Sequence, residues 1–521
     1  MGLAPFSSKN PTKSWGDAWR SMLHPRVVSL LFLGFSAGLP ILLIFSSLSL
    51  WLREAGVERS AVTFFSWAAL GYSFKFVWAP LVDRIPVPWL TKVFGRRRGW
   101  LLLSQTAVIF ALLFMAAHDP VDGLIWVAIG AVMLGFSSAT QDIIIDAYRI
   151  EAADDDLQAM MSSAYIAGYR IGMLVAGAGA LALASRFTVE DAGVYDYQAW
   201  ASAYRVMAAC MLVGIVTTFL VPEPENNERA KETTYQTTDY LRFLMLFVIA
   251  AGVFIFGFIL LSNPINSMKA MMVDSGVSAH IAGFLSGSGR LLGSVSGAGF
   301  TAWLLIKAHV VPRAMVQETY VAPFADFFHR YGKVAVYLLL LIGTYRIADV
   351  VMGTVSNVFY SDMGYTKEQI AAISKTFGLI MTLTGGFLGG LLAVRYGVMR
   401  ILWTGGLLAA LSNVLFAILA SMEPSILYLS MVIAADNLSG GLASAAFIAF
   451  LSSLTNKAFT AMQYAIFSSL MTLVPKLLAG YSGTVVDALD YPAFFIGSAL
   501  LGLPVLLLIS YVGKLLEKQE G

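Results

Sequence analysis

Residues 135–149 read GFSSATQDIIIDAYR and close a long, mostly apolar run that begins near residue 124. On a helix, Asp142 and Asp146 lie on one face because they are four positions apart. A carboxylate inside an apolar segment that is long enough to cross a bilayer is costly, and it is by default a candidate functional residue. The stretch therefore predicts a membrane-spanning helix that carries an acidic face.

The whole chain has the composition of a membrane protein. Its 521 residues are 58% hydrophobic and 13% charged, and its mean hydropathy is +0.73, whereas a soluble protein carries about 25% charged residues. A net charge of +2 gives no reason to expect a nucleic-acid partner. The single cysteine, Cys210, excludes disulfides within the chain, and the five histidines fall in loops or at span ends without ligand spacing. We expect neither a metal nor a cofactor.

Apolar windows of about 20 residues predict membrane-spanning helices along the whole chain. Fourteen such windows lie at residues 27–52, 61–82, 100–117, 124–147, 159–185, 199–221, 241–261, 281–306, 334–360, 370–394, 399–420, 426–451, 462–487 and 492–513. The runs are continuous rather than alternating, which excludes a β-barrel and predicts an all-α polytopic membrane protein. Both termini are expected in the cytoplasm, because the reverse orientation would export Arg96, Arg97 and Arg98.

Weak internal similarity predicts two six-helix bundles. Gln158-Ala159-Met160 opens the fifth span and Thr460-Ala461-Met462 opens the thirteenth. Repeated halves are typical of secondary transporters, whose substrate site lies between the halves near the midplane. The expected segments are a cytoplasmic N-terminal segment (1–26), an N-terminal six-helix bundle (27–221), a linker with two inserted spans at about 241–261 and 281–306 and an amphipathic segment (222–333), a C-terminal six-helix bundle (334–513) and a cytoplasmic tail (514–521).

The loop after the second span carries one acid and several arginines, namely Asp83, Arg84, Arg96, Arg97 and Arg98. It resembles the signature loop of the major facilitator superfamily, which implies that superfamily's fold. A carboxylate and arginines at cytoplasmic helix ends can pair with each other and with helix termini, and so hold one conformation of a rocking bundle. Anchoring by positive charge would explain the arginines alone, but it gives Asp83 no role. We therefore expect these five residues to form a cytoplasmic latch.

Charged and amide side chains within the predicted spans are the candidates for substrate binding or proton coupling. They are Gln141, Asp142, Asp146, Lys75, Arg170, Arg346, Asp349, Lys375, Asp436, Asn437 and Lys476. Such residues are rare in spans unless they face a wet cavity or one another. Mutual neutralisation is the simpler interpretation, and Arg346 and Asp349 are spaced for it on one helix. However, cations outnumber acids in the spans, which favours an anionic substrate.

Ion coupling requires a group that gains and loses its ion as exposure alternates between the two sides. The acids of the spans are the candidates, and we rank them Asp142, Asp349, Asp436 and Asp146. Sodium coupling would use the same carboxylates, so both ions stay open at this point. No glycine pattern is followed by the Lys-Ser or Lys-Thr of a nucleotide-binding loop, which favours a secondary transporter.

Five motifs in order resemble the AmpG family of muropeptide permeases of Gram-negative bacteria. They are GFSAGLPILL (34–43), GYSFKFVWAPLVDR (71–84), FGRRRGWLL (94–102), SATQDIIIDAYR (138–149) and GYRIGMLVAG (168–177), and residues 436–470 resemble the same family. The resemblance implies proton-driven import of N-acetylglucosaminyl-1,6-anhydro-N-acetylmuramic acid, with or without its stem peptide, across the bacterial inner membrane. It also implies a part in peptidoglycan recycling and β-lactamase induction, and it maps the family's Gln-Asp pair and later acid onto Gln141, Asp142 and Asp146.

Two other functions are compatible with parts of the sequence. A transporter of the same fold for another anion, such as acetyl-CoA, would also use a basic cavity. A membrane enzyme acting on lipid-linked sugars would need catalytic carboxylates or histidines in sizeable outer loops, and the longest expected outer loops, 186–198 and 262–280, are short. We therefore expect no enzyme activity. The expected protein is a monomer whose partners are the anhydro-muropeptide, protons and the lipid bilayer.

Overall fold

The computed structural model describes residues 15–57, 72, 74–152, 155–188, 195–225, 235–479 and 482–520. Within these ranges every regular element is a helix, which confirms the all-α prediction. The chain divides into two compact units. The larger unit combines Met1–Arg229 with Phe327–Gly521, and the smaller one is Ala230–Asp326.

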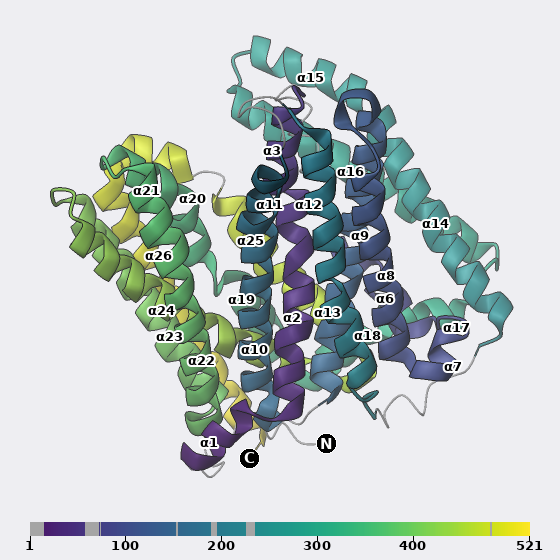
Figure 1. The fold of residues 1–521 in the computed structure, drawn as a ribbon. Coiled ribbons are helices and arrows are strands. Elements are labelled where there is room, and N and C mark those ends of the chain that lie inside the picture. The colour runs from purple at the N-terminus through teal and green to yellow at the C-terminus, as the bar shows by residue number, and fades with distance from the viewer. Residues whose placement is uncertain are drawn as a thin grey trace. The chain divides into compact units, whose positions relative to one another are not determined.

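The first half of the larger unit forms the N-bundle, shown in purple to teal in Figure 1. His24 caps its first long helix by accepting a hydrogen bond from the backbone N–H of Arg26, and Pro25 occupies the first helical position, where no N–H is needed. The helices of this half are α1 (Trp15–Met22), α2 (Pro25–Ile44), α3 (Ser46–Glu54), η3 (Lys75–Val77), α6 (Ala79–Arg84), α7 (Leu90–Phe94), α8 (Arg96–Ala116), α9 (Pro120–Ala152), α10 (Asp155–Leu174), η4 (Val175–Gly179), α11 (Ala180–Phe187), α12 (Tyr197–Cys210) and α13 (Leu212–Leu220).

Helices α2 and α10 run side by side in the N-bundle (Figure 1). Glycines bring the two backbones into direct contact: a Cβ at Gly38 would lie 2.0 Å from the carbonyl oxygen of Tyr169, and one at Gly168 would lie 1.9 Å from that of Leu31. Small residues are the usual means by which membrane helices approach closely. This crossing fixes the part of α10 that carries Tyr169 and Arg170.

The second half of the larger unit forms the C-bundle. A second glycine crossing joins two of its helices, because a Cβ at Gly385 would lie 2.0 Å from the carbonyl oxygen of Leu438. Its helices are α19 (Val334–Thr344), α20 (Ile347–Asp362), α21 (Lys367–Ile370), η7 (Ala371–Phe377), α22 (Gly378–Tyr396), α23 (Val398–Ala420), α24 (Ile426–Leu454), η8 (Lys457–Phe459), α25 (Thr460–Ala479) and α26 (Ser482–Glu520).

Each bundle has its own apolar core, and the two bundles meet through α10 with α22 and α9 with α25. At the first of these contacts a Cβ at Gly390 would lie 2.3 Å from the hydroxyl oxygen of Ser163. The close approach of the bundles therefore depends on a glycine in α22.

The smaller unit consists of α14 (Thr237–Leu260), α15 (Ser262–Asp274), α16 (Ala279–Lys307), α17 (Arg313–Val316), η6 (Gln317–Val321) and the start of α18 (Ala322–Tyr331). Helices α14 and α16 pack together. Arg290 of α16 donates a hydrogen bond of 2.6 Å to the carbonyl oxygen of Phe258, and its guanidinium lies 3.9 Å from the centre of the Phe258 ring. A local contact thus accommodates this cation in an apolar helix.

Twelve helices are long and apolar enough to cross a membrane among the described residues. The predicted span at 61–82 lies largely outside the described residues, and α16, which covers the span predicted at 281–306, is not among the twelve. The count of fourteen, the cytoplasmic termini and the domain boundaries stay predictions. The window 462–487 also stays a prediction, because residues 480 and 481 between α25 and α26 lie outside the described residues. Helix α26 leaves the helical conformation at Asp490, between the predicted windows 462–487 and 492–513.

Candidate functional site

The acidic face predicted on α9 is present and meets a lysine from the end of the second span. Lys75 Nζ lies 3.5 Å from an Asp146 carboxylate oxygen, and Arg149 Nη2 lies 3.5 Å from the other oxygen of Asp146. Asp142 is one helical turn away and is only 6% exposed. Its Oδ1 atom has no hydrogen-bond partner among the residues that the structure describes. The two acids therefore have different environments: Asp146 is paired with cations, and Asp142 retains an unused acceptor.

Tyrosines surround Asp142. Tyr72, Tyr165 and Tyr169 are close enough to this carboxylate to interact with it electrostatically. The Tyr72 hydroxyl donates a hydrogen bond of 2.6 Å to Ser138, one turn before Asp142 on α9. Aromatic faces with hydroxyl groups beside a carboxylate acceptor are suited to a solute that carries sugar rings and hydroxyls.

Two predicted amides take part in helix packing. Gln141 is fully buried, and its Nε2 donates to the Ser36 hydroxyl of α2 over 3.2 Å. Asn437 accepts a 2.8 Å hydrogen bond from the Thr382 hydroxyl and donates to the carbonyl oxygen of Ile433. The structure thus places Gln141 between α9 and α2, and Asn437 between α24 and α22.

A line of charges runs through the middle of the C-bundle and reaches the N-bundle. Arg346 lies at the break between α19 and α20, and it is close enough to Arg170 of α10 for the two guanidinium groups to repel one another. Asp349 interacts with Arg346, and Asp436 interacts with Asp349 while accepting a 3.0 Å hydrogen bond from Ser412. These four predicted residues are therefore brought together.

Lys375 and Lys476 differ from this group. Lys375 lies in η7 and Lys476 lies near the end of α25, and both side chains are exposed.

Two of the five predicted latch residues, Asp83 and Arg97, form a buried ion network with Glu151. Arg97 Nη2 lies 2.8 Å from an Asp83 oxygen and 2.6 Å from a Glu151 oxygen, and all three side chains are buried. Arg96 donates to the carbonyl oxygen of Asp83 over 2.5 Å. Arg98 instead donates to carbonyl oxygens at the end of α13, and Arg84 is buried in α6.

This network joins the two bundles. Arg97 donates a 2.7 Å hydrogen bond to the Thr460 hydroxyl of α25, and Thr460 donates to Glu151. The backbone N–H of Met462 donates to Asp83 over 3.0 Å. We call Asp83, Arg97, Glu151 and Thr460 the ionic lock. The carboxylate of Asp83 thus meets the N-terminal N–H groups of α25, where negative charge is stabilised.

A second contact between the bundles lies beside the ionic lock. Arg149 Nη1 donates to the Ser452 hydroxyl of α24 over 2.6 Å, and its guanidinium lies 5.1 Å from the centre of the Tyr464 ring. Arg149 also donates to Ser162 in its own bundle over 3.0 Å. Since Arg149 also pairs with Asp146, this contact connects the acidic face of α9 with the C-bundle.

Local geometry holds Arg97 in place. Gly95 has a φ of +90°, a region that favours glycine, and a Cβ there would lie 2.4 Å from the Glu223 side chain. The Glu223 carboxylate accepts hydrogen bonds from the backbone N–H groups of Arg97 and Arg98 over 2.7 and 3.0 Å. Burial raises the pKa of the Glu223 carboxyl, although these two N–H groups lower it. Glu223 therefore caps the helix on which Arg97 sits.

Sequence reasoning missed several residues of these contacts. Glu151 and Arg149 lie just beyond the predicted end of the fourth span, and Thr460 and Ser452 belong to the other bundle. The repeated tripeptides beginning at Gln158 and Thr460 were the available signal, because each lies in the first turns of a helix at the junction of the bundles.

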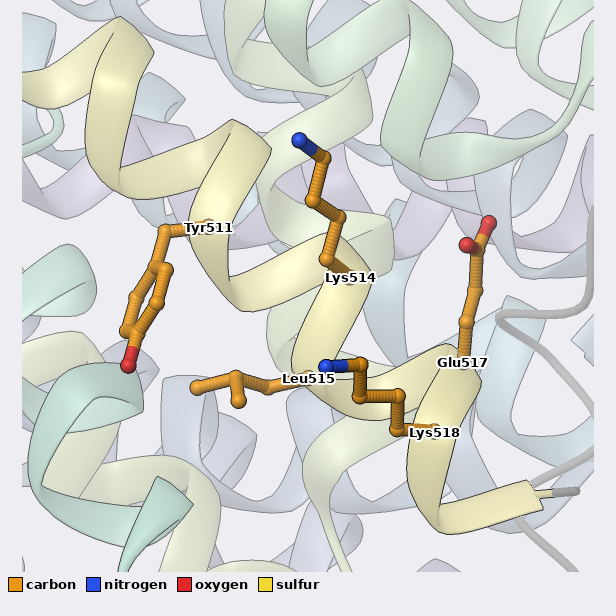
Figure 2. Close-up of a pocket in the computed structure, with 5 residues that line it drawn as sticks. All are labelled: Tyr511, Lys514, Leu515, Glu517 and Lys518. Atoms are coloured by element: carbon orange, nitrogen blue, oxygen red, sulfur yellow. The ribbon is translucent and has the colours of Figure 1, made fainter.

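A pocket on the surface of the C-bundle lies apart from the predicted site residues. A surface pocket at the last turns of α26 is lined by Tyr511, Lys514, Leu515, Glu517 and Lys518 (Figure 2), and it contains none of the predicted site residues. Among the residues that the structure describes, no group of three or more His, Cys, Asp and Glu side chains is arranged to hold a metal ion.

The fold and a family model define the class of protein. The model of the Major Facilitator Superfamily matches residues 63–317. Two solved structures cover nearly the whole chain: the transporter FucP in the outward conformation has a TM-score of 0.61 at 10% identity and covers 95% of this chain and 99% of its own. The proton:xylose symporter XylE has a TM-score of 0.57 at 12% identity, with 96% of each chain covered. The chain therefore has the fold of these transporters.

Relatives with higher sequence identity define the family. A protein of Rickettsia conorii named putative transporter AmpG 4 is 30% identical over 487 residues, which cover 94% of this chain and 96% of the relative. The anhydromuropeptide permease of Escherichia coli K12 is 28% identical over 499 residues, which cover 96% of this chain and 82% of that protein. The chain therefore belongs to the AmpG family, and it is a multi-pass protein of the bacterial inner membrane.

Proposed function

We propose that this chain imports anhydro-muropeptides from the periplasm to the cytoplasm and that the proton gradient drives the import. The observation that carries the proposal is the similarity, over nearly the full length, to the Escherichia coli anhydromuropeptide permease. The surroundings of Asp142 support it, because sugar rings pack on aromatic faces and hydroxyls pair with carboxylates. Arg170 and Arg346 support it too, because the stem peptide of the solute carries carboxylates.

Asp142 is our candidate for the proton site. Its neighbour Asp146 is engaged by Lys75 and Arg149, whereas Asp142 keeps an acceptor atom without a hydrogen-bond partner among the described residues. A buried carboxylate with an unpaired oxygen is stabilised by binding a proton, and it can release that proton when its exposure changes.

In this proposal the closed ionic lock corresponds to the conformation that is closed toward the cytoplasm. With both termini in the cytoplasm, the lock lies on the cytoplasmic side and closes that side. Opening toward the cytoplasm then requires Arg97 to leave Thr460, and Arg149 to leave Ser452. Solute and proton reach Asp142 from the periplasmic side while the lock is closed.

Uptake into right-side-out vesicles tests the function. Labelled anhydro-disaccharide, with and without a tripeptide, should accumulate in energised vesicles, and a protonophore should abolish the accumulation. Labelled acetyl-CoA serves as the competing anion, and its uptake in place of the muropeptide would reject the proposed solute. Accumulation that persists with the protonophore and follows a sodium gradient would reject proton coupling.

The Asp142→Asn variant tests the proton site. It should lose accumulation against a gradient and keep exchange of labelled for unlabelled solute, because exchange does not require net proton movement. Asp119→Asn is a matched control, since Asp119 accepts a hydrogen bond from Tyr195 in the N-bundle away from Asp142. Full accumulation by Asp142→Asn would remove this residue from the coupling role.

A further inference from the structure

Arg170 and Arg346 are two like charges at equivalent depths of opposite bundles. Arg170 lies near the middle of the candidate span Leu157–Phe187, and Arg346 lies near the middle of Val334–Ser356. They are close enough to repel one another. Two cations that face each other at mid-membrane destabilise the contact between the helices that carry them.

No acidic group in the part of the chain that the structure describes offsets this repulsion. The charged and ionisable groups that act on it, among the described residues, are Arg346 and Tyr169. Its side chain is exposed, and α10, which carries it, packs against α22 and α24 of the other bundle. Arg170 therefore lies on a helix at the junction of the bundles. An anion from solution can therefore reach it.

Arg346 presents a second feature that favours an anion. It occupies the N-cap of α20, where the chain leaves the helical conformation between α19 and α20. Interrupted helices in transporters place the positive end of a helix dipole at the substrate site. Asp349 interacts with Arg346, but no carboxylate oxygen of the described residues forms an ion pair with either arginine.

We propose that Arg170 and Arg346 form an anion clamp that binds one carboxylate of the transported solute from both bundles at once. Guanidinium groups bind carboxylates in a planar, two-point geometry, so one carboxylate accepts hydrogen bonds from both arginines. Because each arginine belongs to a different bundle, the bound carboxylate replaces their repulsion by a shared attraction. The solute thereby stabilises the conformation in which the bundles close around it. The identity of the solute in this inference rests on the proposed function.

Binding of a charged and a neutralised probe tests the clamp. The probes are the anhydro-disaccharide tripeptide and the same compound with its peptide carboxylates converted to methylamides, titrated calorimetrically into the full-length chain in nanodiscs. The unmodified chain should bind the charged probe about 10- to 100-fold more tightly, as expected for charge-assisted hydrogen bonds. Arg170→Ala and Arg346→Ala should bind both probes with nearly equal affinity.

A matched arginine provides the control. Arg205 lies in the membrane-spanning helix α12 with an exposed side chain, so Arg205→Ala should keep the full preference for the charged probe. Unchanged preference in Arg170→Ala or Arg346→Ala would overturn the clamp.

Charge reversal tests the clamp without any solute. Arg170→Glu places a carboxylate opposite Arg346 and should draw the bundles together, while the double variant Arg170→Glu/Arg346→Glu should restore repulsion. Spin labels at Ser185→Cys and Glu423→Cys, in a Cys210→Ser background, report the distance between the span ends that lie away from the ionic lock. The distance should shorten in the single variant and return to the parent value in the double one.

The two experiments separate the clamp from the proposed function. If the parent chain binds neither probe, the proposed solute is wrong, and the spin-label distances still decide whether the arginines act between the bundles. An unchanged distance in Arg170→Glu would overturn the clamp even if the parent chain binds both probes.

Discussion

The bundles meet at two places that treat charge in opposite ways. In the ionic lock, Arg97 is paired with two carboxylates and a hydroxyl, and all of these groups are buried. At mid-span, Arg170 faces Arg346 with no ion pair to an acid among the described residues. The charges of the lock are paired without a solute, whereas the arginine pair is completed by an anion. A transporter needs this difference. Arginines that were already paired with acids of the protein would gain little free energy by binding a solute.

Arg97→Ala, which breaks the ionic lock, should cause the largest loss of folding free energy. It leaves Asp83 and Glu151 buried without their cation, which costs about 3–5 kcal/mol of folding free energy. Unfolding in detergent micelles, followed by tryptophan fluorescence, measures the loss. Uptake should fall with it, because the closed state of the lock is lost.

Two variants sharpen this result. Arg98→Ala is the control, since the Arg98 side chain donates to backbone carbonyls at the end of α13 rather than to carboxylates, and it should cost about 1 kcal/mol. Adding Asp83→Asn and Glu151→Gln to Arg97→Ala should recover much of the stability, because no unpaired charge remains. Equal losses in Arg97→Ala and Arg98→Ala would contradict the assignment of the lock.

Gly390→Val should weaken the approach of the two bundles between the lock and the arginine pair. A Cβ at this position meets the Ser163 hydroxyl oxygen at 2.3 Å, and overpacking of this kind costs about 1–3 kcal/mol. The variant should shift the population away from the locked conformation, as measured by thiol labelling of cysteines introduced near Thr460. Gly386→Val is the control, because nothing lies closer than 4.0 Å to a Cβ there. Relief of the effect by Ser163→Gly would confirm its steric origin.

The sequence predicted the fold class and both groups of charges, but not how those charges pair. Apolar windows, the signature loop and the in-span residues follow from one helix at a time, so spacing alone reveals them. The partners of Arg97 are separated from it by 54 residues at Glu151 and 363 residues at Thr460. Helical spacing carries no information on contacts of that separation, which depend on how the two bundles dock.

Helical spacing also gives no information on what the predicted amide side chain of Gln141 contacts. Gln141 was predicted from its neighbour Asp142, but adjacent residues on a helix point about 100° apart. Asp142 lies among tyrosines, whereas Gln141 faces Ser36 inside the N-bundle. The role of Gln141 in substrate binding stays a prediction, and its observed contact is with a helix of its own bundle.

Ser452→Ala should have a smaller effect, since it removes one acceptor of Arg149 at the second contact between the bundles. Arg149 keeps its hydrogen bond to Ser162, so the loss should be about 1 kcal/mol. Thiol labelling near Thr460 should increase slightly, and solute affinity should not change. Ser453→Ala is the matched control, because the Ser453 hydroxyl donates only within α24, to the carbonyl oxygen of Phe450. Indistinguishable labelling of the two variants would show that this contact does not hold the bundles together.

Thr382→Val should have the smallest effect and decides whether Asn437 acts in packing or in recognition. The variant removes the donor of the 2.8 Å hydrogen bond to Asn437 Oδ1 and should cost about 0.5–1 kcal/mol of folding free energy. Thr384→Val is the control, because the Thr384 hydroxyl donates only to the carbonyl oxygen of Ile380. If Asn437 serves packing, the affinity for the tripeptide probe stays constant while stability falls. A change in affinity would instead show that Asn437 contacts the solute, since the freed amide oxygen then becomes available to it.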